Sequence, residues 1–231
     1  MTEKIGRFVY KSIAFIIIST TISTMNQDWP YLNKYRQENA ELPIAESGEN
    51  RIVFMGDSIT EFWSTVQPDF FLEKPYINRG ISGQTTPQML VRFRADVIDL
   101  KPSLVVILAG GNDIAGNTGP STLQMIQNNI FSMVELAQAH QIKVILCSVL
   151  PANHFHWKPK EKPADNIVAL NEILSQYAEV NNIQYLDYYP AMVNEHKGLK
   201  VDYTDDGVHP NKAGYQLMAP LLEKTIALAL K

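Results

Sequence analysis

The apolar residues of this chain follow two alternating patterns from about residue 50 onward. Short continuous apolar runs, rich in Val, Ile and Leu and bounded by polar residues, Pro or Gly, are typical of strands buried on both faces of a sheet. Such runs predict strands at residues 51–55, 76–78, 104–109, 143–149 and 183–186. Between them, apolar residues recur at helical spacing, which predicts amphipathic helices at residues 86–100, 121–140, 165–180 and 211–230.

The alternation of strands and helices predicts the fold class. Strands that are apolar throughout and separated by helices form parallel sheets with helices on both faces. Right-handed crossovers restrict such a sheet to a doubly wound arrangement. The chain has 231 residues, 45% of them hydrophobic, which is enough for one sizeable core. We therefore predict one α/β domain at residues 51–231.

The first residues have a different organisation. Basic residues precede a short apolar stretch at residues 13–18, and small polar residues follow at 19–24. This order is typical of a secretory signal, and the apolar stretch is short for a membrane span. We predict a signal peptide or N-terminal anchor at residues 1–25 and an exported protein, with a cytoplasmic protein as the alternative. No clear cleavage motif is present, and no membrane span is predicted in the domain that follows.

A helix and a linker are predicted between this segment and the domain, at residues 26–50. Asp28 is suited to cap the helix and Pro30 to occupy its first turn. Apolar residues on one face extend this helix over residues 31–42.

Composition excludes several classes of partner and cofactor. The formal net charge is −4 and no basic block stands out, so nothing favours a nucleic-acid partner. The single cysteine, Cys147, lies in an apolar run and is interpreted as a core residue. His154 and His156 form a His-x-His pair without visible third and fourth ligands, so no metal site is predicted. No phosphate-binding glycine loop is present, and no cofactor is predicted.

Four short polar segments carry the candidate chemistry. They are residues 56–60, 78–80, 110–113 and 206–209. The first three follow predicted strands, and ligands of an open parallel sheet bind outside the carboxyl ends of its strands. Together the segments supply a hydroxyl, an imidazole, a carboxylate, a carboxamide and glycine backbone. Acyl transfer requires this set: a nucleophile, a base, an orienting acid and oxyanion donors.

Each candidate residue also has a structural interpretation. Ser58 precedes a predicted helix at residues 59–63, whose free N–H groups favour an oxyanion, but a serine there can simply cap the helix. Asp206 and His209 are three residues apart, so a turn can direct both to one side and let the carboxylate fix the imidazole tautomer. The same pair commonly caps a helix. Asp57 is interpreted as a structural residue of its loop.

The carboxamide and glycine candidates also have two interpretations each. Asn112 can donate to an oxyanion, or can occupy a left-handed position in a glycine-rich turn. Gly80 can offer a backbone N–H, or can be an ordinary turn residue.

Taken in order, the four segments resemble the signature blocks of the SGNH (GDSL) hydrolase superfamily. The matching residues are Gly56-Asp57-Ser58 with Ile59 in place of leucine, Gly80, Gly110-x-Asn112-Asp113 and Asp206-x-x-His209. The resemblance implies a flavodoxin-like sheet of five parallel strands. It also implies that Ser58 is the nucleophile, His209 the base and Asp206 the orienting acid. The implied oxyanion hole consists of the Ser58 N–H, the Gly80 N–H and the Asn112 carboxamide, and no cofactor is implied.

The wider sequence resembles platelet-activating-factor acetylhydrolase-like and carbohydrate O-acetyl esterase members. We therefore expect a serine esterase that acts on short-chain esters, acetyl above all, with a small-molecule or glycan ester as substrate. The alternatives are a lysophospholipase-like lipid hydrolase and a non-catalytic glycan-binding protein on the same fold. The Gly-x-Ser-x-Gly motif of ordinary α/β-hydrolases is absent, because Thr60 occupies its last position.

Two further interpretations concern aromatic residues. The proline-bounded stretch at residues 151–163, which contains Trp157, follows a strand and is either a flap over the site or an ordinary surface loop. Trp63 either lines the site or packs in the core.

Overall fold

The computed structural model describes residues 28–45 and 49–231. The signal segment predicted at residues 1–25 lies outside the described residues and stays a prediction. Within the described ranges, no helix combines the length and the apolar character that a membrane crossing requires.

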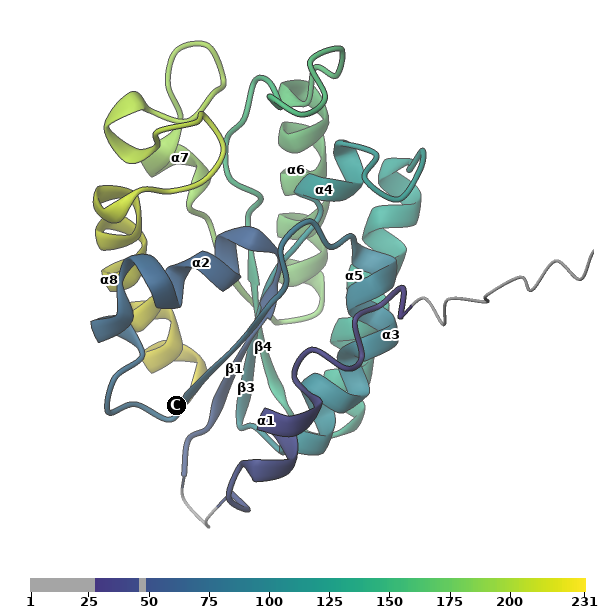
Figure 1. The fold of residues 1–231 in the computed structure, drawn as a ribbon, viewed down its shortest axis with the longest axis vertical. Coiled ribbons are helices and arrows are strands. Elements are labelled where there is room, and N and C mark those ends of the chain that lie inside the picture. Colours follow the sequence, from purple (N-terminus) through teal and green to yellow (C-terminus); the bar gives the residue numbers. More distant parts are fainter. Residues whose placement is uncertain (1–27, 46–48) are drawn as a thin grey trace, which may run out of the picture.

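Five parallel strands form one sheet in the order β2-β1-β3-β4-β5 (Figure 1). Their bounds are β1 (Ile52–Gly56), β2 (Tyr76–Gly80), β3 (Leu104–Leu108), β4 (Lys143–Cys147) and β5 (Gln184–Leu186). The predicted doubly wound α/β fold is confirmed. Because β1 pairs with β2 on one side and β3 on the other, the chain reverses direction across the sheet between β1 and β3. Such a switch point is where open α/β sheets bind ligands.

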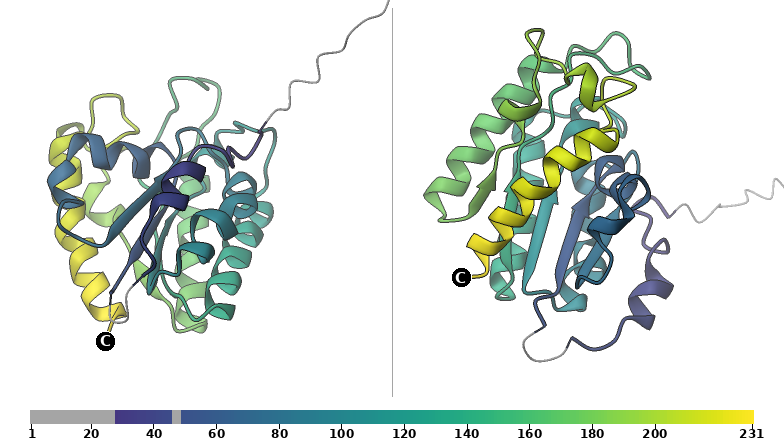
Figure 2. Two further views of the ribbon diagram at one scale, coloured as in Figure 1. Left: turned by 60° about the horizontal axis from the view of Figure 1, so that its bottom comes forward. Right: turned by 90° about the vertical axis from the view of Figure 1, so that its left-hand side faces the viewer.

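Helices cover both faces of the sheet (Figures 1 and 2). The long helices are α2 (Ser58–Val66), α3 (Thr86–Asp96), α5 (Leu123–Ala139), α6 (Ala164–Val180) and α8 (Lys212–Ala229). Alternate strand residues face opposite sides of a sheet, so Val53 and Met55 pack with α3, α5 and α6, whereas Ile52 and Phe54 pack with α2 and α8. Two cores result, one on each face, and the central residues of β1, β3 and β4 are buried, whereas those of the edge strands β2 and β5 are half-buried.

Several short elements were not predicted from the sequence. They are α4 (Gly111–Ile114), α7 (Tyr189–Met192) and 3-10 turns at Pro68–Phe70, Ile98–Leu100 and Val201–Tyr203. The end of the helix predicted at residues 86–100 also differs. α3 ends at Asp96, and a 3-10 turn replaces the expected last helical turn. Lys101 then adopts a left-handed conformation ahead of Pro102, which cannot continue a helix.

The N-terminal segment departs from the predicted helix at residues 31–42. The Asp28 carboxylate accepts the N–H groups of Leu32 and Asn33 at 2.9 and 2.8 Å, as a cap would. Tyr31, however, has φ of 58°, a left-handed conformation that breaks a helix. Asp28 therefore closes a turn, and the helix proper, α1 (Arg36–Glu41), begins one turn later.

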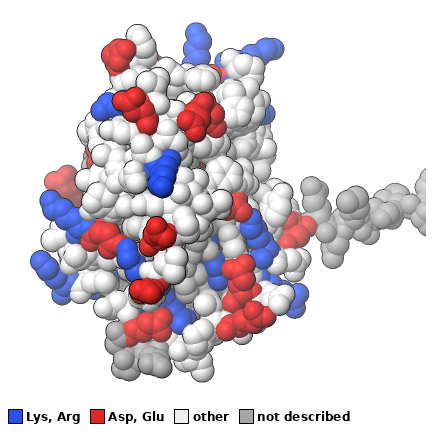
Figure 3. All heavy atoms as spheres, turned by 60° about the vertical axis from the view of Figure 1, so that its left-hand side comes forward, with Lys and Arg blue, Asp and Glu red and all other residues white. Residues whose placement is uncertain are grey.

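Acidic and basic side chains are interspersed over the face seen in Figure 3. No block of one sign covers that face, in agreement with the small net charge of −4.

Candidate active site

The first polar segment forms a tight connection from β1 into α2. Gly56 ends the strand where a Cβ atom would lie 2.1 Å from Thr60 Oγ1 and 2.9 Å from the Leu108 carbonyl oxygen, so only glycine fits. Asp57 is the N-cap of α2, and its carboxylate accepts the Ile59 N–H at 3.0 Å. Ser58 is the first residue of the helix, where N–H groups lack helical partners. The Ser58 N–H accordingly has no acceptor among the described residues.

A chain of two hydrogen bonds connects Ser58 to the loop before α8. Ser58 Oγ lies 2.8 Å from His209 Nε2, and His209 Nδ1 lies 2.6 Å from Asp206 Oδ2. Residues 151 positions apart in the sequence thus meet at the carboxyl edge of the sheet. The hydroxyl is thus hydrogen-bonded to one nitrogen of the imidazole, and the carboxylate is hydrogen-bonded to the other.

The loop around Asp206 fixes the imidazole. Asp206 Oδ1 accepts the backbone N–H groups of Val208 and His209, both at 2.8 Å. Partial burial disfavours the charged form of Asp206, but the hydrogen bonds from His209 and Val208 outweigh it and lower its pKa to about 2. Two aromatic rings lie near the His209 ring, with centroids at 5.4 Å for Phe62 and 6.3 Å for Trp157. The carboxylate is therefore ionised at neutral pH and the ring has little freedom to turn.

Asn112 lies in α4, directly after β3. The left-handed residue is Gly110, with φ of 119°, and not Asn112, which excludes the turn interpretation of Asn112. The Asn112 Nδ2 group donates to Asp57 Oδ2 at 3.2 Å and to the Gln84 carbonyl oxygen at 3.1 Å. Its Oδ1 accepts from Asn117 Nδ2 at 2.7 Å. The amide is thus held between the turn before Ser58 and the loop after β2.

Gly80 does not present a free N–H group. Its N–H is donated to Asn78 Oδ1 at 2.8 Å. A Cβ atom on Gly80 would lie 2.2 Å from the Glu61 nitrogen, so this glycine allows β2 to pack against α2. The structure thus corrects the expectation that Gly80 is an oxyanion donor, because its hydrogen-bonding capacity is used within its own strand end.

A second glycine of the same loop, which was not predicted as a site residue, has an N–H group that is unpaired within the described residues. Gly83 has φ of 76°, is exposed, and its N–H has no acceptor among the described residues. Its carbonyl oxygen accepts from Asn117 Nδ2 at 3.3 Å, so it lies beside the residue that also contacts Asn112. The available signal was a second glycine three residues after Gly80.

Two buried carboxyl groups, those of Asp57 and Asp113, lie next to the site in the sequence and accept hydrogen bonds from its loops. Burial raises the pKa of Asp57 to about 6, although the Ile59 N–H opposes the shift. Burial likewise raises the pKa of Asp113 to about 6, against hydrogen bonds from the Thr86 side chain and N–H. Asp113 accepts the Thr86 N–H at 2.9 Å and so joins the start of α3 to α4.

The free energy of unfolding of Asp113→Asn, relative to that of the wild type, is expected to increase as the pH rises. An acid whose folded pKa of about 6 exceeds its unfolded value of about 3.9 binds its proton more tightly in the folded state. Its stabilising contribution is therefore complete below about pH 4 and is lost as the pH rises through about 6. Since asparagine does not titrate, the free energy of unfolding of the variant minus that of the wild type should rise by about 2 kcal/mol from pH 4 to pH 7.

Urea unfolding at a series of pH values measures this difference. Asp202→Asn, at an exposed position, is the control for the loss of one acidic residue. A relative stability of Asp113→Asn that falls with rising pH would show that the fold binds this carboxyl group as an anion.

The stretch at residues 151–163 lies over the site. Trp157 Nε1 donates to Asn117 Oδ1 at 3.0 Å, and its ring lies nearly parallel to that of His209, at an angle of 29°. Trp157 therefore contacts both the imidazole and the residue that holds Asn112. Trp63, by contrast, is a core residue, stacked on Phe70 with centroids 4.6 Å apart. In the described part of the chain, no group of three or more His, Cys, Asp or Glu side chains could hold a metal ion.

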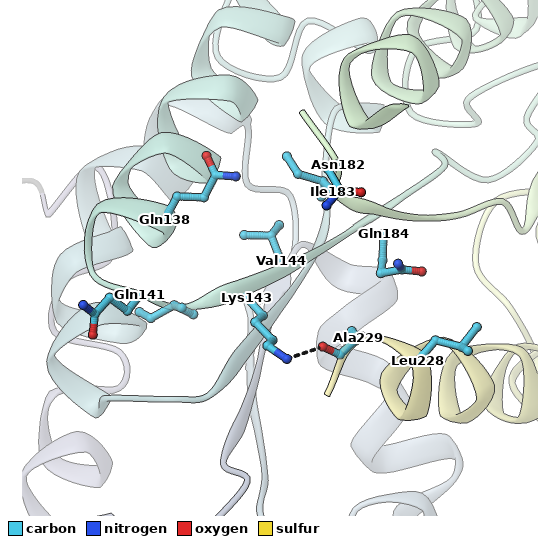
Figure 4. A pocket seen from close by; sticks show the side chains of 10 residues that line it. Gln138, Gln141, Lys143, Val144, Asn182, Ile183, Gln184, Leu228 and Ala229 are labelled. Carbon is cyan, nitrogen blue, oxygen red and sulfur yellow. Dashed lines mark hydrogen bonds between the residues drawn. The ribbon is translucent and has the colours of Figure 1, made fainter. Parts of the chain in front are cut away.

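A separate hollow of about 480 Å³ opens beside the amino ends of β4 and β5, at the opposite edge of the sheet (Figure 4). Lys143 Nζ donates to the Ala229 carbonyl oxygen there, at 2.7 Å. None of the candidate site residues lines this hollow.

Comparison with known proteins identifies the family. The chain matches the GDSL-like lipase/acylhydrolase family over residues 54–217. The solved structure of a GDSL-like lipase from Bacteroides thetaiotaomicron is 49% identical, with a TM-score of 0.85 over 87% of this chain and 98% of that one. An acetylxylan esterase from Xylanibacter ruminicola is 27% identical over 64% of this chain and 35% of its own length. An Escherichia coli protein named thioesterase 1/protease 1/lysophospholipase L1 is 24% identical over 80% of this chain and 87% of its own length.

Two further curated relatives are matched over only 32% and 60% of their own length. The family match nevertheless spans most of the chain and includes the loops that carry Ser58, Asn112 and His209. The sheet of five parallel strands agrees with the solved relative. The chain belongs to the GDSL-like lipase/acylhydrolase family.

Proposed function

We propose that this protein is a serine esterase that hydrolyses short-chain O-acyl esters through an acyl-enzyme. The observation that carries the proposal is the hydrogen-bonded chain from Ser58 to His209 at 2.8 Å and from His209 to Asp206 at 2.6 Å. A nucleophile, a base and an orienting acid at these distances constitute a serine-hydrolase triad. A non-catalytic glycan-binding protein has no need for this alignment.

Acylation begins when Ser58 Oγ attacks the ester carbonyl carbon and His209 Nε2 takes the hydroxyl proton. Asp206 holds Nδ1–H and stabilises the imidazolium that forms. The tetrahedral intermediate then collapses, the bond from the carbonyl carbon to the alcohol oxygen breaks, and His209 returns the proton to that oxygen. Water attacks the acyl-enzyme in the same way, gives its proton to His209, and releases the carboxylic acid as Ser58 regains a proton. Every proton passes through the imidazole.

The intermediate's oxyanion needs donors beside Ser58. The proposed donors are the free Ser58 N–H at the start of α2 and the Asn112 carboxamide, whose Nδ2 must exchange one of its two present acceptors. The unpaired Gly83 N–H supports a place for Gly83 in this set, instead of Gly80.

A short acyl group, acetyl above all, and a carbohydrate alcohol are the proposed substrate features. The relative named acetylxylan esterase supports this choice. The relative named lysophospholipase supports the alternative of a lipid ester. We also propose export through the N-terminal segment, on the order of basic, apolar and small residues in the sequence.

Chain-length preference separates the two substrates. The wild-type kcat/KM for p-nitrophenyl acetate is expected to exceed that for p-nitrophenyl octanoate by about tenfold or more, because a long acyl chain needs an apolar groove. p-Nitrophenyl butyrate should lie between them. A preference for octanoate would favour the lipid ester and contradict the acetyl proposal.

A further inference from the structure

A cavity at the rim of the site is built in part by residues outside the family match. It has a volume of about 720 Å³. Its lining includes Asp28, Trp29 and Tyr31, together with Gln84, Gln88 and Asn117. The first three precede the matched region, which begins at residue 54. The N-terminal segment therefore completes a cavity that the matched region leaves open.

Asn117 connects this cavity to the reacting groups. Its amide nitrogen donates to Asn112 Oδ1 at 2.7 Å, and its amide oxygen accepts from Trp157 Nε1 at 3.0 Å. Trp157 in turn lies over His209. A residue of the cavity wall thus contacts the proposed oxyanion donor directly and is connected to the proposed base through Trp157. The cavity therefore lies beside the groups that a bound ester must reach.

The lining is aromatic and polar without free charge. Trp29 and Tyr31 are 42% and 51% exposed, and neither the indole N–H nor the phenol hydroxyl has a partner among the described residues. Among the described lining residues, Asp28 alone is charged, and its carboxylate accepts the N–H groups of Leu32 and Asn33. The described part of the lining contains no Lys or Arg that could pair with a phosphate, and no aliphatic side chain that offers a surface to an acyl chain.

A sugar ring matches this chemistry. Its C–H faces pack on aromatic rings, and its hydroxyl groups exchange hydrogen bonds with amides, hydroxyls and indole N–H groups without needing charge. A lysophospholipid would bring a phosphate and a long chain, and the cavity provides for neither.

The aromatic pair is held in place by backbone anchors. Gln88 Nε2 donates to the Trp29 carbonyl oxygen at 2.7 Å, and Gln84 Nε2 donates to the Pro30 carbonyl oxygen at 2.8 Å. Both glutamines are buried, at 5% and 1% exposure. The Gln84 carbonyl oxygen also accepts from Asn112. The surface is therefore pre-organised and in fixed relation to Asn112, which lowers the entropic cost of binding.

We propose that this cavity binds a sugar ring of the ester's alcohol portion, with Trp29 and Tyr31 as its stacking surface. The proposal rests on the esterase function proposed above. According to this proposal, the N-terminal segment determines which alcohol portion is accepted. The catalytic roles proposed for Ser58, Asp206 and His209 are unchanged.

The test compares two substrate classes in the full-length protein. Initial rates are measured for p-nitrophenyl acetate and for a panel of acetylated xylo-, manno- and gluco-oligosaccharides. For Trp29→Ala, and likewise for Tyr31→Ala, the ratio of kcat/KM on the preferred sugar acetate to kcat/KM on p-nitrophenyl acetate should fall about tenfold, mainly through KM. Trp29→Phe should recover most of this ratio.

Leu32→Ala is the matched control, because Leu32 is also 42% exposed in the same segment but does not line the cavity. Its ratio should equal that of the wild type. The deacetylated oligosaccharide should also inhibit p-nitrophenyl acetate hydrolysis competitively in the wild type, and less so in Trp29→Ala. Competitive inhibition of the wild type tests sugar binding even if an alanine variant does not fold.

The outcomes distinguish the two proposals. A wild type active on p-nitrophenyl acetate but on no sugar acetate, or a ratio unchanged in both alanine variants, would overturn the sugar site and leave the esterase function standing. A wild type inactive on every ester would overturn both.

Discussion

Ser58→Ala is expected to lower kcat for p-nitrophenyl acetate by about 10³-fold or more, and to leave the melting temperature close to that of the wild type. Among the described residues, the Ser58 hydroxyl is the only group hydrogen-bonded to His209 Nε2, at 2.8 Å, so its removal should end acyl-enzyme formation. Stability should change little, because the cap of α2 is the Asp57 carboxylate and not the serine side chain. Residual hydrolysis would come from water that His209 activates near the remaining oxyanion donors.

Initial-rate kinetics and thermal unfolding measure the two parts of this prediction. Ser132→Ala, in α5, is the matched control for loss of a serine hydroxyl. A fluorophosphonate probe should add one label to the wild type and none to Ser58→Ala, as read by intact-protein mass spectrometry. Substantial activity or labelling in Ser58→Ala would show that another residue is the nucleophile.

Asp206→Asn should lower kcat by about 10³- to 10⁴-fold with a small change in KM. The carboxylate accepts Nδ1–H of His209 at 2.6 Å and so leaves Nε2 free to accept the serine proton. An asparagine amide can donate to Nδ1 instead, which stabilises the tautomer that carries its proton on Nε2. That tautomer cannot act as a base toward Ser58.

Asp205→Asn provides the control, since Asp205 is the exposed neighbour of Asp206 in the same loop. Because the pKa of Asp206 is about 2, the wild-type carboxylate stays ionised across the assay range above about pH 4. The defect of Asp206→Asn should therefore persist at every pH in that range. A variant that retains more than about a tenth of wild-type kcat would contradict the orienting role.

The sheet was predictable because its strands are apolar on both faces, a pattern that few other elements produce. Strand ends were less certain, because apolar residues continue past them. The predicted strand at residues 143–149 ends at Cys147, and Val149 is instead paired with the Asn171 side chain, which accepts its N–H at 2.8 Å and donates to its carbonyl oxygen at 2.9 Å. A side chain that substitutes for a neighbouring strand leaves no trace in the hydrophobic pattern.

The proposed triad residues could be selected from the sequence, since Ser58, Asp206 and His209 each occupy a short motif with a distinct chemical use. The choice between glycines could not. Gly80 and Gly83 lie three residues apart in one loop, and only the contact from Asn78 shows which N–H is occupied. Asn117 likewise matters through its partners in space, because one amide among many carries no local signature.

The N-terminal segment is fastened by its own main chain, through the carbonyl oxygens of Trp29 and Pro30. Side chains at positions 29 and 31 can therefore be exchanged while the fastening stays intact. If the cavity binds the alcohol portion as proposed, a library randomised at these two positions would vary the preferred alcohol while leaving Ser58, Asp206 and His209 unchanged.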